Sequence, residues 1–231
     1  MAYIDPAGNA FNDVSSEAEI YLNDGNDSID ALFGGETFVY GGNGNDGLYY
    51  DGLAFAHLYG GHGNDQLGGG ANGDFLYGEE GVDFIQAASG NDLVDGGAGN
   101  DWLLGGAGRD TLIGGLGADS FVFSAATESL RGASRDVIRD FTHSEADRID
   151  LSQLDADPAT VAIEHFKFIG TQSFSEFHRK HPGSDAVLLR FDERHHLLQG
   201  DTHQNYRTDV QDFEVKLVGV SHLANADLIL A

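Results

Sequence analysis

Aspartate residues recur at regular intervals through the first half of this sequence, each near the end of a short glycine-rich segment. The clearest copies are Gly41–Tyr49, Gly60–Gly68, Gly96–Leu104, Gly105–Ile113 and Gly114–Val122, which share the pattern Gly-Gly-x-Gly-x-Asp-x-U-x, where U is a large apolar residue. Carboxylate and backbone carbonyl oxygens held together in this way are the ligands that Ca²⁺ prefers. The pattern therefore predicts metal binding rather than acid–base or nucleophilic chemistry.

Two nonapeptides are expected to form one coil, so each turn stacks on the turn two repeats away and the aspartates fall on two edges. The first edge carries Asp27, Asp46, Asp65, Asp83, Asp101 and Asp119, and the second carries Thr37, Ala56, Asp74, Asp92 and Asp110. Stacked carboxylates repel one another unless a cation lies between them. Counting the gaps between neighbouring aspartates predicts about seven Ca²⁺ ions, with Asp119 at the end of its edge.

Backbone carbonyl groups of the turns are the expected additional ligands. The candidates are Gly41, Gly42, Asn43, Gly44, Gly60, Gly61, His62, Gly63, Gly96, Gly97, Ala98, Gly99, Gly105, Gly106, Gly108, Gly114, Gly115 and Gly117. Mg²⁺ prefers a tighter octahedron, and transition metals prefer nitrogen or sulfur ligands that do not recur here. The alternative is a set of ordinary turns with solvated carboxylates, which stays open for the degenerate first turn containing Asp24.

The elements that must position these turns are short strands, one in each repeat. The apolar U positions are Ile20, Ile29, Val39, Leu48, Leu58, Leu67, Leu76, Ile85, Val94, Leu103, Leu112 and Phe121. We expect each to point inward from a strand of about three residues, with its neighbours pointing outward. The fold predicted is all-β, a parallel β-roll. Each repeat buries only one large side chain, and the free energy gained by this burial is small compared with the conformational entropy lost when nine glycine-rich residues become ordered. The roll is therefore predicted to fold only when Ca²⁺ binds.

Composition excludes several other classes of protein. The 231 residues carry a formal net charge of -26, which argues against nucleic acid or an anionic membrane as a partner. There is no Cys, so disulfides and a thiol nucleophile are excluded. The first residues lack the features of a cleavable signal peptide, and no apolar run has transmembrane length.

The second half of the chain has a different pattern. Short antiparallel strands are predicted at residues 136–141, 148–151, 163–169, 185–191, 197–198, 213–218 and 227–230, and a helix at 173–181. The open end of a solenoid needs a cap. We therefore expect an N-terminal segment (1–21), a calcium-binding roll (22–123) and a β-rich C-terminal cap (124–231).

Particular segments of the cap resemble a known family. Residues 134–141 (SRDVIRDF), 146–152 (ADRIDLS), 211–219 (QDFEVKLVG) and 226–231 (ADLILA) resemble the C-terminal domain of serralysin-type metalloproteases, and are similar to the R-modules of mannuronan epimerases and to other type I-secreted RTX proteins. The resemblance implies a further Ca²⁺ near Asp136 and Asp147, and a secretion signal in Asp227–Ala231. It also implies export by a type I apparatus to the extracellular space, with retention at the cell surface as one alternative.

Motifs for catalysis are missing from this sequence. It contains neither an H-E-x-x-H helix nor a G-x-S-x-G elbow. His178, His181, His195, His196 and His203 lie close together in the sequence but do not form a convincing zinc ligand set, so surface histidines are expected. The prediction is a secreted, non-catalytic calcium-binding protein; the alternative is the C-terminal part of a larger metalloprotease or epimerase.

Outward aromatic residues on one sheet are the remaining feature. The expected register aligns Phe38, His57 and Phe75 in one ladder and Tyr40, Tyr59 and Tyr77 in another. An apolar outward patch marks a contact surface. Its cover is predicted to be the N-terminal segment, a protein partner such as a second copy, or a glycan.

Overall fold

The computed structural model describes residues 2–4, 18–31, 35–154, 166–181, 187–201 and 213–230. Two long sheets, A and B, face each other across the core. In spatial order, sheet A contains β1 (Ala2–Ile4), β2 (Ala18–Tyr21), β4 (Thr37–Asn43), β6 (Ala56–His62), β8 (Phe75–Glu80), β11 (Leu93–Ala98), β14 (Thr111–Leu116), β16 (Asp136–Ile138), β21 (Glu214–Leu217), β20 (Leu197–Asp201), β19 (Leu188–Asp192) and β18 (Lys167–Phe168).

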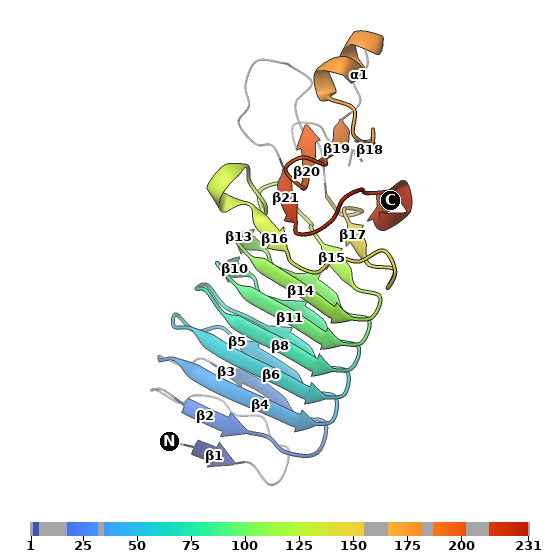
Figure 1. The fold of residues 1–231 in the computed structure, drawn as a ribbon. Helices are drawn as coiled ribbons and strands as arrows, with labels where there is room; N and C mark the ends of the chain where they lie inside the picture. Colours follow the sequence, from blue (N-terminus) through green and yellow to red (C-terminus); the bar gives the residue numbers. More distant parts are fainter. Residues whose placement is uncertain are drawn as a thin grey trace.

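Sheet B runs beside it, so the chain alternates between the sheets as it winds up the roll (Figure 1). Its strands are β22 (Leu228–Ile229), β17 (Arg148–Asp150), β15 (Ser120–Val122), β12 (Trp102–Leu104), β9 (Phe84–Gln86), β7 (Gln66–Gly68), β5 (Gly47–Tyr50) and β3 (Ser28–Ala31). The other described elements are the pair β10 (Ser89–Gly90) and β13 (Ala107–Gly108), the helix α1 (Phe174–Lys180), and the 3₁₀ turns η1 (Gly132–Ser134) and η2 (Asn225–Asp227).

The predicted apolar positions form the core between the two sheets. Every one from Ile20 to Phe121 is at most 2% exposed. They stack in register along each sheet, as in the pairs Val39–Leu58 and Leu58–Leu76 of sheet A and Leu67–Ile85 of sheet B. The fold prediction of an all-β parallel roll is confirmed.

Strand length differs between the sheets, which the sequence analysis did not anticipate. Strands of sheet B are three or four residues long in the roll, as expected, but β4 and β6 have seven residues. They continue into the glycine turn, where Gly42 pairs with Gly61. The two backbones approach so closely that a Cβ at Gly61, whose φ is +108°, would overlap the Gly42 carbonyl oxygen.

The prediction of antiparallel strands after residue 123 is wrong for several of them. β16 pairs in parallel with β14 and with β21, and β17 pairs in parallel with β15 and with β22. Ile138 and Leu217 thereby extend the apolar stack of sheet A, and Ile149 and Leu228 extend that of sheet B. Only β19–β20 and β20–β21 are antiparallel among the described strands, so the last coils continue the roll before the hairpins cover its end.

A buried polar network fastens these last strands together. The Ser129 hydroxyl donates to the Glu214 carbonyl oxygen (2.6 Å) and accepts from the Asp136 amide (2.8 Å). The Glu214 carboxylate is paired with Arg135 and accepts from Gln199 Nε2 at 2.7 Å. Each polar group thus has a partner where burial would otherwise be costly.

At the N-terminal end, β1 adds one parallel strand to the edge of sheet A beside β2. The N-terminal segment (1–21), which is predicted to cover the aromatic ladders, lies largely outside the described residues. Among the described residues, no helix has the length and apolarity that a membrane span requires.

Candidate calcium-binding edges

A continuous relay of hydrogen bonds links the aspartates of the first edge. The backbone N–H of each donates to Oδ1 of the aspartate one coil further on, at distances such as 2.8 Å from Asp27 to Asp46 and 2.7 Å from Asp65 to Asp83. The complete order is Asp27, Asp46, Asp65, Asp83, Asp101, Asp119 and Asp147. The expectation that Asp119 ends this edge is wrong, because its own N–H donates to Asp147 at 3.1 Å.

The second edge contains a shorter relay of the same kind. It begins at the Ala56 N–H, which donates to Asp74 Oδ1 at 2.8 Å, and it continues through Asp92 and Asp110 to Asp136. Thr37 is buried, but its hydroxyl donates to the Gly35 carbonyl oxygen and its N–H donates to the Phe55 carbonyl oxygen. Carboxylates therefore begin on this edge only at Asp74.

The second oxygen of most ladder aspartates is buried without a hydrogen-bond partner. This applies to Oδ2 of Asp46, Asp65, Asp83, Asp92, Asp101, Asp110, Asp119 and Asp136. Two members differ: Asp74 Oδ2 accepts the Gly70 N–H (2.7 Å) and Asp147 Oδ2 accepts the Thr142 N–H (2.7 Å). A buried, unpartnered carboxylate oxygen is costly, so its repetition at equivalent positions points to an ionic partner.

Glycine leaves space for that partner beside most of these oxygens, namely Oδ2 of Asp46, Asp65, Asp83, Asp101, Asp110 and Asp119. A Cβ added at Gly96 would lie 2.5 Å from Asp101 Oδ2 and 2.7 Å from the Gly114 carbonyl oxygen of the next coil. The same arrangement recurs at Gly60, where a Cβ would overlap Asp65 Oδ2 and lie 2.8 Å from the Gly78 carbonyl oxygen. One carboxylate oxygen and one carbonyl oxygen from adjacent coils thus face a common space.

Burial of these carboxyl groups makes their ionised form unfavourable without a cation. Burial raises the pKa of Asp83 to about 7, with further contributions from neighbouring Asp101 and Asp65. The pKa values are raised to about 6 for Asp46, Asp101 and Asp110, about 7 for Asp119, and about 8 for Asp92 and Asp136. At neutral pH the relay therefore favours either bound protons or bound cations.

The donor set fits Ca²⁺. No group of three or more His, Cys, Asp or Glu side chains that could hold a metal gathers within the described part of the chain. The backbone carbonyl oxygens that face the carboxylates are ligands that Ca²⁺ accepts and that softer metals do not favour. Of the predicted carbonyl ligands, those of Asn43, His62 and Ala98 already accept backbone N–H groups at 2.7, 2.7 and 2.8 Å.

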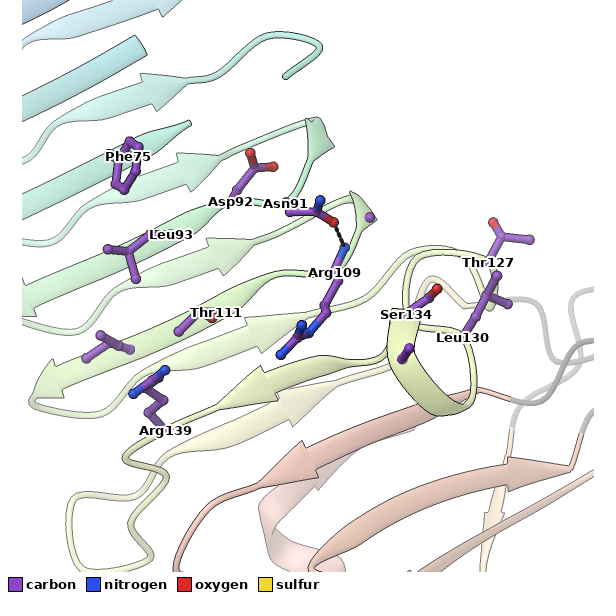
Figure 2. Close-up of a pocket in the computed structure, with 13 residues that line it drawn as sticks. Phe75, Asn91, Asp92, Leu93, Arg109, Thr111, Thr127, Leu130, Ser134 and Arg139 are labelled. Atoms are coloured by element: carbon purple, nitrogen blue, oxygen red, sulfur yellow. Dashed lines mark hydrogen bonds between the residues drawn. The ribbon is translucent and has the colours of Figure 1, made fainter. Parts of the chain in front are cut away.

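Sequence reasoning missed a second, exposed relay beside the first edge. Asn26, Asn45, Asn64 and Asn100 each accept, through Oδ1, a backbone N–H from a later coil, with donors at Asn45, Asn64, Val82 and Ala118. On the second edge Asn91 accepts from the Arg109 N–H at 3.0 Å, next to Asp92 (Figure 2). The signal was present in the sequence, since asparagine directly precedes the turn aspartate in many repeats.

A further missed residue is Asp140. Its two carboxylate oxygens accept the N–H groups of Gly114 (3.0 Å) and Gly115 (2.8 Å), so it closes the last glycine turn of the roll. Asp24, predicted as a weak ligand, is exposed and accepts from Asn43 Nδ2 at 2.6 Å.

Histidines considered for zinc have other partners where they are described. His195 pairs with Asp192 at 2.9 Å, and His196 Nδ1 lies 2.5 Å from the Val220 carbonyl oxygen. His181 Nδ1 lies 3.0 Å from the Phe177 carbonyl oxygen. The His178 side chain and His203 lie outside the described residues.

Both aromatic ladders form on the outer face of sheet A. Phe38, His57 and Phe75 stack with ring centroids 4.2 and 4.6 Å apart. Tyr40, Tyr59 and Tyr77 stack at 4.8 and 4.9 Å, and Tyr21 extends this ladder by one ring at 4.7 Å. The planes are tilted by 10° or less, so the rings cover one another's faces and turn their edges toward solvent.

This combination of a parallel roll, glycine turns and stacked aspartates defines an RTX-type β-roll. The family model described as Peptidase M10 serralysin C terminal matches residues 24–230, and the chain belongs to this family. The family is the C-terminal, non-catalytic part of its proteins, and its RTX repeats are of the calcium-binding kind.

Solved structures similar to the chain include two from Azotobacter vinelandii. The AlgE6R2 subunit of mannuronan C5-epimerase is 26% identical, with 73% of this chain and 89% of that chain covered and a TM-score of 0.35. The AlgE6R3 subunit of the same enzyme is 30% identical, with 73% and 79% covered and a TM-score of 0.30. No curated relative matches the sequence significantly.

Proposed function

We propose that this protein is a secreted, non-catalytic calcium-binding module that folds when it meets extracellular Ca²⁺. The observation that carries this proposal is the repetition of a buried, unpartnered Oδ2 along both aspartate relays. When bound, Ca²⁺ would supply the positive charge that these oxygens lack. The chain supplies the carboxylates, the facing carbonyls and the glycines that leave room between them.

Without the ion, the same relays oppose folding. Each coil places a buried carboxylate beside others of the same charge, in a chain whose net charge is -26. Because a site of this kind does not exist in the unfolded chain, the free energy of ion binding becomes free energy of folding. The protein should therefore remain largely unfolded at cytosolic Ca²⁺ and fold at millimolar Ca²⁺.

Circular dichroism during a Ca²⁺ titration tests this proposal. In EGTA at pH 7.5 the β-sheet signal should be weak, and it should rise cooperatively in the sub-millimolar to millimolar range of Ca²⁺. Mg²⁺ at equal concentration is the matched control and should restore little of the signal. A native β-sheet spectrum with a sharp thermal transition in EGTA would refute Ca²⁺-triggered folding. Calorimetry of the same samples would count the ions, for which we propose about seven.

Export by a type I apparatus is the second part of the proposal. Most of the predicted signal, Asp227–Ala231, lies among the described residues and takes part in the fold: Asp227 pairs with His143 at 2.8 Å and β22 pairs with β17. The signal would therefore be accessible only before folding, which agrees with an unfolded state at low Ca²⁺. Appending residues 124–231 to an unfolded passenger should permit export by a reconstituted type I system, whereas residues 124–226 should not. Equal export of both fusions would refute this assignment.

The alternative is that the chain serves as the C-terminal part of a larger secreted enzyme. The family model that matches residues 24–230 describes the C-terminal part of serralysin peptidases, which gives this alternative its support. An upstream catalytic open reading frame would favour this alternative, whereas incubating the Ca²⁺-loaded chain with mannuronan and with casein tests the non-catalytic role itself. Turnover of either substrate would contradict a non-catalytic role for the chain itself.

For the two aromatic ladders on sheet A we propose chiefly a stabilising role. They span the coils in which Thr37 and Ala56 occupy the positions of ladder aspartates. Stacked rings would contribute there what bound ions contribute further along the roll. Since the rings already cover one another, the ladders offer a partner only their edges and the tyrosine hydroxyls.

A further inference from the structure

The outer face of sheet B differs from the rest of this acidic protein because it carries no charge in the middle of the roll. Outward side chains of β5, β7, β9, β12 and β15 are all uncharged. Charged residues return only at the borders, with Asp30 on β3 and with Arg148 and Asp150 on β17. A neutral strip across five consecutive coils is unusual in a chain with a net charge of -26.

Aromatic rings on this strip are available to solvent. Trp102 is 55% exposed and Phe84, its register partner on the neighbouring strand, is 40% exposed. Neither ring stacks on another ring among the described residues, in contrast to the ladders of sheet A. Neighbouring exposed rings form an apolar patch of the kind that marks a contact surface.

Tyr49 lies flat on the same strip because its neighbours are glycines. A Cβ at Gly68 would lie only 2.8 Å from Tyr49 Cδ1, so the ring covers the backbone of Gly68. Its hydroxyl donates to Gln66 Oε1 at 2.7 Å, which holds the ring in this orientation. The ring is 41% exposed, and its outer face is directed toward solvent.

We propose that this face, which we call the sheet B platform (Tyr49, Gln66, Phe84, Gln86 and Trp102), binds a neutral oligosaccharide or polysaccharide. Sugar rings present apolar C–H faces that stack on aromatic planes, and hydroxyls that exchange hydrogen bonds with amide groups. Gln66 and Gln86 are exposed amides placed among the three aromatic side chains. Strands spaced about 4.8 Å apart present these groups in a row along the roll, which suits an extended chain of sugars.

Charge favours this occupant over two others. A polyanionic ligand would be repelled by the net charge of the protein and would find no cation on the platform. A second copy of the chain would bring two strongly negative molecules face to face. The inference rests on the proposed non-catalytic surface role, and it requires the Ca²⁺-folded roll.

Trp102 also supplies the assay, because it is the single tryptophan of the chain. Its fluorescence should shift to shorter wavelength when a sugar covers it. The full-length protein in millimolar Ca²⁺ would be titrated separately with cellohexaose, laminarihexaose, mannohexaose and chitohexaose, and with hexagalacturonate as the anionic counterpart. Isothermal calorimetry of the same pairs gives the affinities. We expect at least one neutral hexasaccharide to bind and hexagalacturonate not to bind.

Variants then locate the site. Phe84→Ala and Trp102→Ala should each weaken binding by about tenfold or more, since each removes a stacking plane. Trp102→Phe should retain part of the affinity. Leu53→Ala is the matched control, because it removes an apolar side chain that is 85% exposed but lies off the platform. Circular dichroism with and without Ca²⁺ confirms that every variant folds as the parent does.

The possible results separate this inference from the proposed function. If the chain folds on Ca²⁺ but binds no neutral saccharide, the platform assignment is wrong while the calcium proposal stands. Preference for hexagalacturonate, or equal binding by Trp102→Ala, would also overturn it. Sedimentation showing a dimer that Trp102→Ala dissociates would assign the platform to a second copy instead.

Discussion

Replacing Asp83 by asparagine separates the two roles of a ladder aspartate. Asp83 Oδ1 accepts the Asp65 N–H at 2.7 Å, and its Oδ2 is buried without a partner. Asparagine keeps an oxygen for the Asp65 N–H but removes the carboxylate charge and places an amide at the position of Oδ2. Asp83→Ala removes both interactions, so the comparison of the two variants isolates the hydrogen bond.

In Ca²⁺ the asparagine variant should be less stable than the parent. Asp83 borders two gaps of the first edge, and an ion present at ten times its Kd contributes about 1.4 kcal/mol. Loss of both ions would lower the free energy of unfolding by about 3 kcal/mol. Asp83→Ala should lose about 1–3 kcal/mol more, because the Asp65 N–H would then be buried without an acceptor.

In EGTA the sign should reverse. Burial raises the pKa of Asp83 from 3.8 to about 7, so at pH 7.5 this carboxyl group is ionised in the folded Ca²⁺-free protein, and its buried charge lowers the free energy of unfolding. That difference corresponds to a penalty of up to about 4 kcal/mol, which asparagine removes. The variant should therefore need less of a stabilising osmolyte to fold in EGTA than the parent does.

Urea denaturation followed by circular dichroism measures the first effect, and trimethylamine oxide titration in EGTA measures the second. Asp30→Asn is the matched control, since it makes the same change in net charge at an exposed position of β3. If Asp30→Asn and Asp83→Asn shifted both transitions equally, net charge rather than ion ligation would explain the results. The reasoning would also fail if Asp83→Asn destabilised the protein equally with and without Ca²⁺.

Three further predictions concern the turns, the aromatic ladder and pH. Gly96→Ala should lower the number of bound ions measured by calorimetry by one and lower the free energy of unfolding by about 1–3 kcal/mol, because the new Cβ would enter the space beside Asp101 Oδ2. An unchanged ion count would contradict the position assigned to the ion. Tyr59→Ala should destabilise the Ca²⁺ form by about 2–3 kcal/mol in urea, whereas Tyr59→Phe, which keeps the stacked ring, should change it by less than about 0.5 kcal/mol. The Ca²⁺-free protein should lose β-sheet signal in EGTA as pH rises from about 5 to 8.5. In the folded state the pKa is raised to about 7 for Asp83 and to about 8 for Asp92, so the folded protein binds more protons in this range than the unfolded chain does, and its stability falls as pH rises. With Ca²⁺ present the dependence should reverse, since protons then compete with the ion; a flat pH profile in EGTA would contradict the burial of these charges.

The parts of the fold set by local repetition could be predicted from the sequence. A large apolar residue at each U position, glycine in each turn and aspartate at its end determine the inward side chains, the close backbone approach and the two edges. Leu58 and Asp65 are examples, since each lies where the repeat places it. Asp136 and Asp147 were reached only through the family resemblance, because their relay bonds span 26 and 28 residues and leave the nonapeptide spacing.

Features that depend on partners distant in the sequence could not be read in this way. The orientation of β16 against β21 is set by a crossover through much of the C-terminal region, so its short apolar run gave no sign of parallel pairing. Ring orientation was equally hidden. Tyr59 stacks because a tyrosine lies above and below it, whereas Tyr49 lies flat because Gly68 has no side chain.

The aspartate relays have a direction, and this direction gives the roll a preferred order of assembly. Each turn donates its N–H to the carboxylate of the following turn, so a stack that grew from the N-terminal end would always carry an unpaired donor at its front. A stack that grew from the other end would not, because Asp136 and Asp147 already offer acceptors to Asp110 and Asp119. We therefore expect the last coils to serve as a template on which the earlier coils order in turn toward the N-terminus. In that order, a chain whose last coils have not yet been synthesised would lack the template and would stay unfolded.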